Sequence, residues 1–281
     1  MQLKIKYYLT CIFLCAIFST KAQSIYSIDS LMHLNKYNEA AVEIEKYVFV
    51  SSFSANEQAD LYFKKTECYK HLNNFNEALN TLDKINLSLI DEQHQYETRY
   101  QMALCNYLDG KYKECNSMIQ QLNYFTKDTL KKQQYLFLDI LNLNELHDWK
   151  TASIKWKEYL KYKNLHADSL QNFYKKYPIL KNAKKAELLA LIIPGSGLMY
   201  AGKIGEGITA FILQTSFLAA GVYLIFKHYY VTGFFVGPGL FTTFHQGSLK
   251  LTEKRITERN ERVATIFNNH IKNNILNIER K

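Results

Sequence analysis

Two short patterns have the residue types of a reactive site, and each departs from the motif that its chemistry requires. Residues 197–203 fit G-x-x-x-x-G-K, a loop whose backbone N–H groups hold phosphate, and an apolar run precedes them. The next residue is Ile204, where the Ser or Thr that binds Mg²⁺ is required. The Gly-Ser-Gly at 195–197 fails the G-x-S-x-G pattern of a nucleophile elbow because Pro194 precedes it. We therefore predict neither a nucleotide site nor a serine nucleophile.

Other titratable side chains are scattered along the chain. Asp91 with Glu92, and Glu39 with Glu43, have the spacing of exposed helical carboxylates, and no two acids form the pair that general acid–base catalysis needs. The histidines have neither an H-E-x-x-H motif nor the paired spacing of metal ligands; they stand at positions 33, 71, 94, 147, 166, 228, 245 and 270. The sequence thus predicts no enzyme, no metal and no cofactor.

The composition is that of a helical protein with two parts. A chain of 281 residues is long enough for two domains of ordinary size. Only three prolines occur, and of the 11 glycines only Gly110 lies before Gly195, so helix breakers are nearly absent from the first two thirds. The formal charge of +9 is mild for a nucleic-acid binder, and no groove-reading or base-stacking motif accompanies it. We expect no nucleic-acid partner.

The N-terminus has the pattern of a secretory signal. Lys4 and Lys6 precede an apolar run over residues 7–18, and Thr-Lys-Ala follows at 20–22. This order of charged, apolar and small residues is typical of a signal peptide, and the run is too short to span a bilayer stably. We predict a cleaved signal over residues 1–22, with a buried or anchoring helix as the alternative. The cysteines that remain include no C-x-x-C pair, which favours buried thiols over disulfides or metal ligands; they are Cys68, Cys105 and Cys115.

A repeated pattern fills most of the following region. Four five-residue segments, at 36–40, 74–78, 111–115 and 148–152, each have an aromatic residue three positions before a small one. The small residues follow one another at intervals of 38, 37 and 37 residues. Such a period indicates one helical unit stacked on its own copies. The anchor pairs are Tyr37 with Ala40, Phe75 with Ala78, Tyr112 with Cys115, and Trp149 with Ala152.

Apolar residues continue from each anchor along one helical face. They stand four and seven positions after the small residue, a spacing that keeps them on one side of a helix. They are Ile44, Leu82, Ile119 and Trp156, then Tyr47, Ile85, Leu122 and Tyr159. The pattern resembles the tetratricopeptide repeat (TPR), although its period exceeds the about 34 residues of that family. The resemblance covers roughly residues 24 to 170 and implies an all-α solenoid of about four helical hairpins over residues 23–172. It also implies a curved scaffold that binds a protein or peptide partner, and the alternative is a spacer.

The last third has the character of a membrane protein. Residues 173–185 form a basic linker with five lysines. Three apolar stretches follow, at 188–201, 208–226 and 229–244. The middle stretch, 19 residues without a charge, approaches the about 20 that cross a bilayer. We expect it to form a transmembrane hairpin with the third stretch, within a membrane-embedded domain over residues 186–247. A helix buried in a soluble core is the alternative.

The first apolar stretch contains a recognisable signature. Its residues resemble the P-G-x-G-x-x-Y-x-G-K motif of small bacterial domains with two transmembrane helices, and of a Bacteroidota family of unknown function that joins this motif to a periplasmic part. That family usually has Gln where this chain has Leu198. The matching residues are Pro194, Gly195, Gly197, Tyr200, Gly202 and Lys203. A proline that ends a helix and glycines that permit positive φ predict a break or re-entrant turn at the membrane surface. The resemblance implies architecture and no reaction.

Residues 248–281 follow as an amphipathic, basic C-terminal helix. Its apolar positions recur at intervals of three, four or seven, a stripe that favours packing on its own protein over packing on a lipid surface; they are Ile256, Val263, Phe267, Ile271, Ile275 and Ile278. A two-helix hairpin after an exported domain leaves both basic flanks outside, against the positive-inside tendency. We retain export because the N-terminal signal is the more specific pattern.

These features favour one function and leave a second open. We expect a non-catalytic scaffold anchored in the inner membrane, whose periplasmic repeats bind a protein partner in envelope assembly or secretion. In the alternative, the membrane hairpin is the working part, as an oligomeric channel-like or membrane-protein biogenesis factor, and the repeats are its docking handle. The expected partners are therefore a protein or peptide on the repeats and the lipid bilayer, with a homo-oligomer through the hairpin left open.

Overall fold

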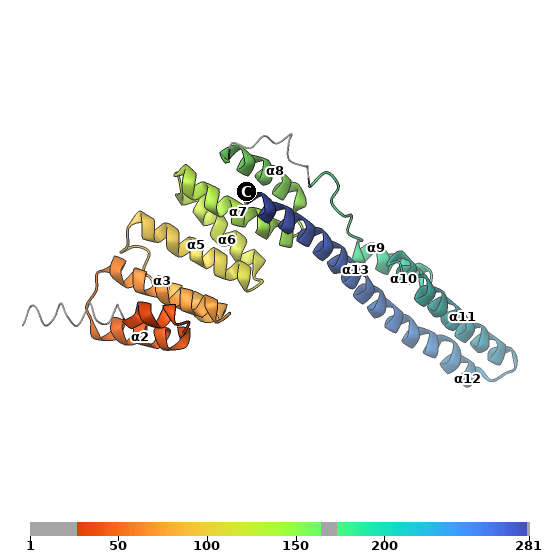
Figure 1. Ribbon diagram of the computed structural model, residues 1–281. Coiled ribbons are helices and arrows are strands. Elements are labelled where there is room, and N and C mark those ends of the chain that lie inside the picture. The colour runs from red at the N-terminus through yellow and green to blue at the C-terminus, as the bar shows by residue number, and fades with distance from the viewer. Residues whose placement is uncertain (1–26, 164–172, 280–281) are drawn as a thin grey trace, which may run out of the picture. The chain divides into compact units, whose positions relative to one another are not determined.

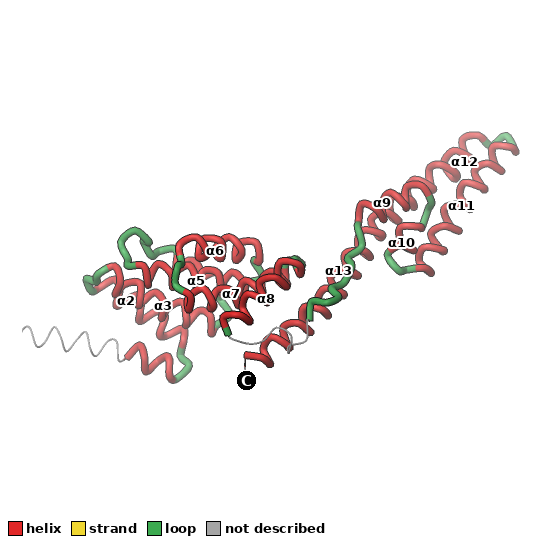
Figure 2. The backbone as a smooth tube through the Cα atoms, turned by 90° about the horizontal axis from the view of Figure 1, so that it is seen from above, coloured by secondary structure: helices red, strands yellow, loops and turns green. Residues whose placement is uncertain are grey.

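The computed structural model describes residues 27–163 and 173–279, and the regular structure of these residues is entirely helical. Figure 2 shows helices joined by loops, with no strand in the described part of the chain. This confirms the predicted all-α class. Contacts divide the chain into two units, Met1–Gln171 and Asn172–Lys281, and each has its own helices. The predicted signal peptide, residues 1–22, lies outside the described residues.

The first unit is a row of helices in which each labelled helix packs against the next (Figure 1). Residues 27–33 are also helical, and they precede the labelled helices. Contacts between α3 and α5, and between α5 and α7, link alternate helices. The bounds are α2 (Tyr37–Val50), α3 (Ala55–His71), α4 (Phe75–Leu82), α5 (Glu92–Leu108), α6 (Tyr112–Phe125), α7 (Thr129–Glu145) and α8 (Trp149–Tyr162).

Polar side chains satisfy the first N–H groups of several helices, which have no partner within the helix. At the start of α3, Ser54 and Glu57 form a reciprocal capping box. Asn74, Asp91 and Asp148 each accept a hydrogen bond from the backbone N–H three residues later, at the starts of α4, α5 and α8. These caps explain why the helices begin at these residues.

Successive helices form four hairpins: residues 27–33 with α2, α3 with α4, α5 with α6, and α7 with α8. The turns inside these hairpins share one backbone conformation. In each, a left-handed residue lies two positions before the aromatic anchor and donates to the carbonyl three residues earlier. The next residue donates to the carbonyl five residues earlier, which completes the Schellman motif at a helix end. The left-handed residues are Asn35 (φ 57°), Asn73 (φ 53°), Gly110 (φ 74°) and His147 (φ 61°). The turn geometry therefore repeats with the same period as the sequence.

The small anchor residues lie in the cores of the hairpins. Each is 0% exposed, and the group comprises Ala40, Ala78, Cys115 and Ala152. The apolar residues four and seven positions later are also buried, among them Ile44, Leu82, Ile119 and Tyr159. Of the aromatic anchors, Trp149 is buried and the other three are half-buried. A small side chain at this point lets the two helices of a hairpin lie close together.

The second unit combines a broken helix with two long ones. α9 and α10 are separated by Pro194 and Gly195, and α11 packs against α10, α12, η1 and α13. The bounds are α9 (Ala183–Ile192), α10 (Ser196–Tyr200), α11 (Ile204–Phe226), α12 (Tyr230–Phe234), the π-helix η1 (Phe235–Gly239) and α13 (Leu240–Glu279). The helix α13 continues through residue 248, where the sequence predicts a separate tail helix. No Gly or Pro follows Gly247, so nothing in the sequence interrupts it.

One helix among the described residues, α11, is long and apolar enough to cross a membrane. It has 23 residues, and only 11% of its most apolar window is buried. Large apolar side chains therefore face outward from it, including Ile208, Phe211, Ile212, Val222 and Phe226. A helix from a soluble core would bury such side chains.

Glycines bring α11 into backbone contact with α12 and η1. A Cβ atom added to Gly221 would overlap the Cα atom of Gly237, and one added to Gly233 would meet the carbonyl of Gly221 at 2.9 Å. Close approach at small residues is how helices gain packing energy where lipid removes the hydrophobic driving force. The glycines of the third apolar stretch therefore fix this crossing.

Replacing Gly110 by Ala tests the repeated turn. No atom lies within 4 Å of the added Cβ, so the cost is that of a left-handed L-residue, about 1–2 kcal/mol of unfolding free energy. The matched control is Gly110→Asn, which should cost less because Asn occupies the equivalent turns at Asn35 and Asn73. Urea unfolding followed by circular dichroism measures both. Equal stability of Gly110→Ala and the parent chain would contradict the backbone argument.

Replacing Gly221 by Ala tests the helix crossing. The new methyl group must displace η1, and overpacking of this kind costs about 1–3 kcal/mol. In Gly247→Ala the methyl group has nothing within 4 Å, so this control on α13 should leave the melting temperature unchanged or raise it. Thermal unfolding of the full chain in detergent micelles compares the two variants. A Gly221→Ala protein as stable as Gly247→Ala would show that the crossing is loose.

Candidate functional site

A groove of 570 Å³ lies on the first unit, where α5 meets the end of α6 and the start of α7. Most of the side chains that line it are aromatic, basic or acidic. The residues that matter for its chemistry are Tyr96, Arg99, Tyr124, Phe125, Lys127 and Lys131, with Glu92 and Asp128 on the same lining. We call this the Arg99 groove.

Arg99 is a buried cation. Its side chain is 8% exposed, and its Nη1 donates to the carbonyl oxygen of Gln95 at 3.0 Å. The guanidinium lies 4.6 Å from the ring centroid of Phe125, which stabilises the positive charge through the ring face. Within the described chain, Nε has no hydrogen-bond partner. Burial lowers the pKa of Arg99, and no acidic group opposes that effect.

The repeat register shows that this arginine is a departure from the pattern. Arg99 stands sixteen residues before the small anchor Cys115. The same position of the neighbouring repeats is occupied by Tyr62, which is 7% exposed, and by Leu136, which is 1% exposed. Among these three repeats, only one has a charged residue at this core position. Arg99 was missed in the search for paired acids and metal ligands; alignment of the repeats would have found it.

Exposed aromatic rings form one edge of the groove. Tyr124 is 82% exposed and Phe125 is 58% exposed, and their rings meet edge to face at 5.0 Å. On the opposite lining, the Tyr96 hydroxyl donates to the carbonyl oxygen of Lys131 at 3.0 Å, which fixes that ring. Exposed Tyr and Phe next to Arg is the composition enriched in the energetic centres of protein interfaces.

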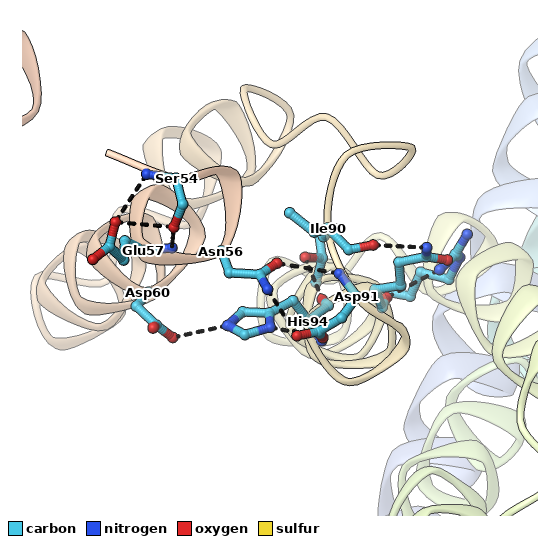
Figure 3. Close-up of polar contacts among 10 residues, drawn as sticks. Ser54, Asn56, Glu57, Asp60, Ile90, Asp91 and His94 are labelled. Carbon is cyan, nitrogen blue, oxygen red and sulfur yellow. Dashed lines mark hydrogen bonds and ion pairs between the residues drawn. The ribbon is translucent and has the colours of Figure 1, made fainter. Parts of the chain in front are cut away.

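A polar network holds the start of α5 against α3 and so positions the groove (Figure 3). Asn56 donates through Nδ2 to Asp91 at 2.9 Å and accepts from the Asp91 backbone N–H at 3.1 Å. Between two carboxylates, the His94 ring has Nδ1 at 2.8 Å from Asp91 and Nε2 at 3.2 Å from Asp60. The hydrogen bond to Asp91, assisted by Asp60, raises the pKa of His94. Since His94 and Arg99 lie on the same helix, this network fixes the helix that carries the buried cation.

The cysteines predicted as buried thiols lie in the repeat cores, and they are poor nucleophiles there. Burial raises the pKa of Cys68 and of Cys105 to about 11, and that of Cys115 to about 12. Thiolate is the reactive form, so these groups are inert at neutral pH. In the described ranges, no cluster of three His, Cys, Asp or Glu side chains is arranged to hold a metal ion.

The membrane signature residues lie together around the α9–α10–α11 break. Gly195 (φ 78°) is the N-cap of α10 and Gly202 (φ 90°) follows the end of that helix, and both adopt the left-handed conformation that favours glycine. A side chain on Gly197 would overlap α9 and α13. The remaining signature residues flank these glycines: Pro194 precedes Gly195, the Tyr200 ring lies 4.9 Å from the Lys181 ammonium, and Lys203 precedes α11. The signature thus encodes a compact turn, whereas the anchor residues of the repeats belong to the first unit.

Polar side-chain contacts, which the sequence did not reveal, hold α11 against α13. The Gln214 Oε1 lies 3.0 Å from Nδ1 of His245, and Gln214 is fully buried. Closer to the start of α11, Arg255 Nε donates to Glu206 at 2.9 Å and Nη1 donates to Glu258 at 2.9 Å. Polar pairs inside an apolar hairpin satisfy each other's hydrogen-bonding groups and so fix helix register.

Comparisons of the chain with protein-family models, with curated proteins and with solved structures give no match.

The network around His94 predicts a dependence of stability on pH. The folded-state pKa of His94 lies above its ordinary value of 6.5, so its stabilising contribution is complete below pH 6.5 and is lost as the pH rises through the raised value. Urea unfolding of the full chain at pH 6 and pH 8 measures the effect. We expect His94→Gln to reduce the loss of stability between these two pH values, and the exposed His33→Gln control to leave it unchanged. Identical pH dependence in both variants would contradict this account.

Proposed function

We propose that this protein is a non-catalytic scaffold of the bacterial cell envelope, anchored in the inner membrane, whose TPR-like repeats bind a protein partner in the periplasm. The observation that carries the proposal is the Arg99 groove, which combines a buried cation that has no carboxylate partner in the described ranges with exposed aromatic rings. These are the groups that supply binding energy at protein interfaces. A repeat array with such a groove is suited to recognition.

Two further features support the TPR-like arrangement. Four hairpins share the turn conformation and the small buried anchor, with intervals of 38, 37 and 37 residues in both. Units of this kind bury their apolar faces against their neighbours and leave long surfaces for partners. We infer that the array is a solenoid of the TPR type with a slightly longer repeat.

In this proposal the α11–α13 hairpin is the part that holds the protein in the membrane. Its exposed apolar surface would be costly in water, and α11 has the length and composition of a membrane span. The signal pattern at residues 1–22 argues for export, which leads us to put the repeats in the periplasm. A partner bound there would be held at the membrane surface.

Site-specific photo-cross-linking tests this function in the native membrane. The full chain carries p-benzoylphenylalanine in place of Tyr124, at the edge of the groove. We expect a covalent adduct with another protein because the exposed ring lies where a partner would be buried. Mass spectrometry of the adduct identifies the partner.

Two control positions make the experiment decisive. Ile154, exposed on α8 and outside the groove, should give no such adduct, and equal labelling there would indicate non-specific capture. Val222, exposed on α11, reports on the hairpin. Adducts between two copies through position 222, with none at position 124, would support the hairpin as the working part and overturn the scaffold proposal.

A further inference from the structure

We propose that the Arg99 groove binds a single carboxylate of the protein partner, with an apolar side chain beside it. This inference rests on the proposed function and specifies the chemistry of the partner. It starts from Arg99, whose Nε has no partner in the described ranges and which forms no ion pair there.

The positive charge of Arg99 has no negative charge to balance it among the described residues. A buried charge is costly unless opposite charges or hydrogen-bond acceptors compensate it. Arg99 has one acceptor, the Gln95 carbonyl oxygen, and no carboxylate partner in the described part of the chain. The Arg99 position is uncharged in the repeats on both sides, Tyr62 and Leu136, so the fold itself does not need a cation there. Arg99 lines the groove, and the planar guanidinium matches the geometry of a planar oxyanion.

The acidic residues of the lining select among oxyanions. Glu92 and Asp128 share the groove with Arg99, and Asp128 also accepts from the Leu130 backbone N–H at 2.8 Å. Against Arg99, Lys127 and Lys131, these two acids leave a formal balance of one positive charge at the groove. That balance suits a monoanionic carboxylate and disfavours a phosphate, which carries nearly two charges at neutral pH.

The aromatic edge determines what accompanies the carboxylate. Phe125 covers one face of the guanidinium, and Tyr124 extends the apolar surface outward from it. An apolar side chain next to the carboxylate would cover these rings and exclude water from the ion pair, which strengthens it. The preferred segment of the partner therefore has an acid with an aliphatic or aromatic neighbour.

Fluorescence anisotropy with three labelled peptides tests this chemistry on the full chain in detergent micelles. The first peptide is Gly-Leu-Glu-Leu-Gly with an amidated C-terminus, the second has Gln in place of Glu, and the third is the Gln peptide with a free C-terminal carboxylate. We expect the first or third peptide to bind about tenfold more tightly than the second, as for one charge-assisted hydrogen-bonded pair. The peptide that gains affinity identifies the source, a side chain or a chain terminus.

Variants of Arg99 separate recognition from folding. Arg99→Leu introduces the residue that the next repeat has at Leu136, so it should fold with unchanged or higher stability while losing about tenfold in affinity for the charged peptide. The conservative Arg99→Lys should retain part of the affinity. Lys113→Gln removes a positive charge from an exposed site on α6 outside the groove and should change neither property.

Several results would overturn the inference. They are equal binding of the three peptides, no binding of any of them, or undiminished binding by Arg99→Leu. Tighter binding of a phosphoserine peptide than of the Glu peptide would overturn the choice of a carboxylate. If position 124 still cross-links to a partner in these cases, the scaffold function stands and only the chemistry assigned to Arg99 fails.

Discussion

The first unit depends on how closely two helices approach at one small, buried residue in each hairpin. Ala40, Ala78, Cys115 and Ala152 are fully covered, and a left-handed turn residue brings each pair of helices together. A larger side chain at any of these positions would push the helices apart and would break the contact with the next hairpin. Because these few positions determine how the hairpins stack, the residue type at other positions, such as that of Arg99, can differ from one repeat to the next.

The second unit depends on close helix approach in the same way. Its helices approach at glycines, Gly221 against Gly237 and Gly195 against Gly207, where an added Cβ would overlap backbone atoms. In water the burial of apolar surface drives such packing, whereas in lipid close contact and internal hydrogen bonds must supply it. The Gln214–His245 pair provides such an internal bond inside the hairpin.

The sequence predicted what is periodic and missed what depends on packing between distant segments. The period located the anchors, the all-α class followed from the scarcity of Gly and Pro, and the run at 208–226 indicated the apolar helix α11. The burial of Arg99 depends on where the end of α6 places Phe125, and no local pattern encodes that. The Gln214–His245 contact joins residues 31 positions apart. The helix α13 is continuous because no Gly or Pro follows Gly247. That absence is visible in the sequence, but the change in composition at residue 248 led to the prediction of a separate helix.

A charge in a repeat core links stability to recognition. The two neighbouring copies have Tyr62 and Leu136 at this position, so the fold does not require a charge there. Residues that reduce the stability of a fold are retained where function requires them. A ligand that neutralises the guanidinium binds the folded state alone, and by mass action it therefore stabilises the array in which the groove is formed. On this reasoning the repeats fold through their common residues, and the exception to the repeat is where a partner would be recognised.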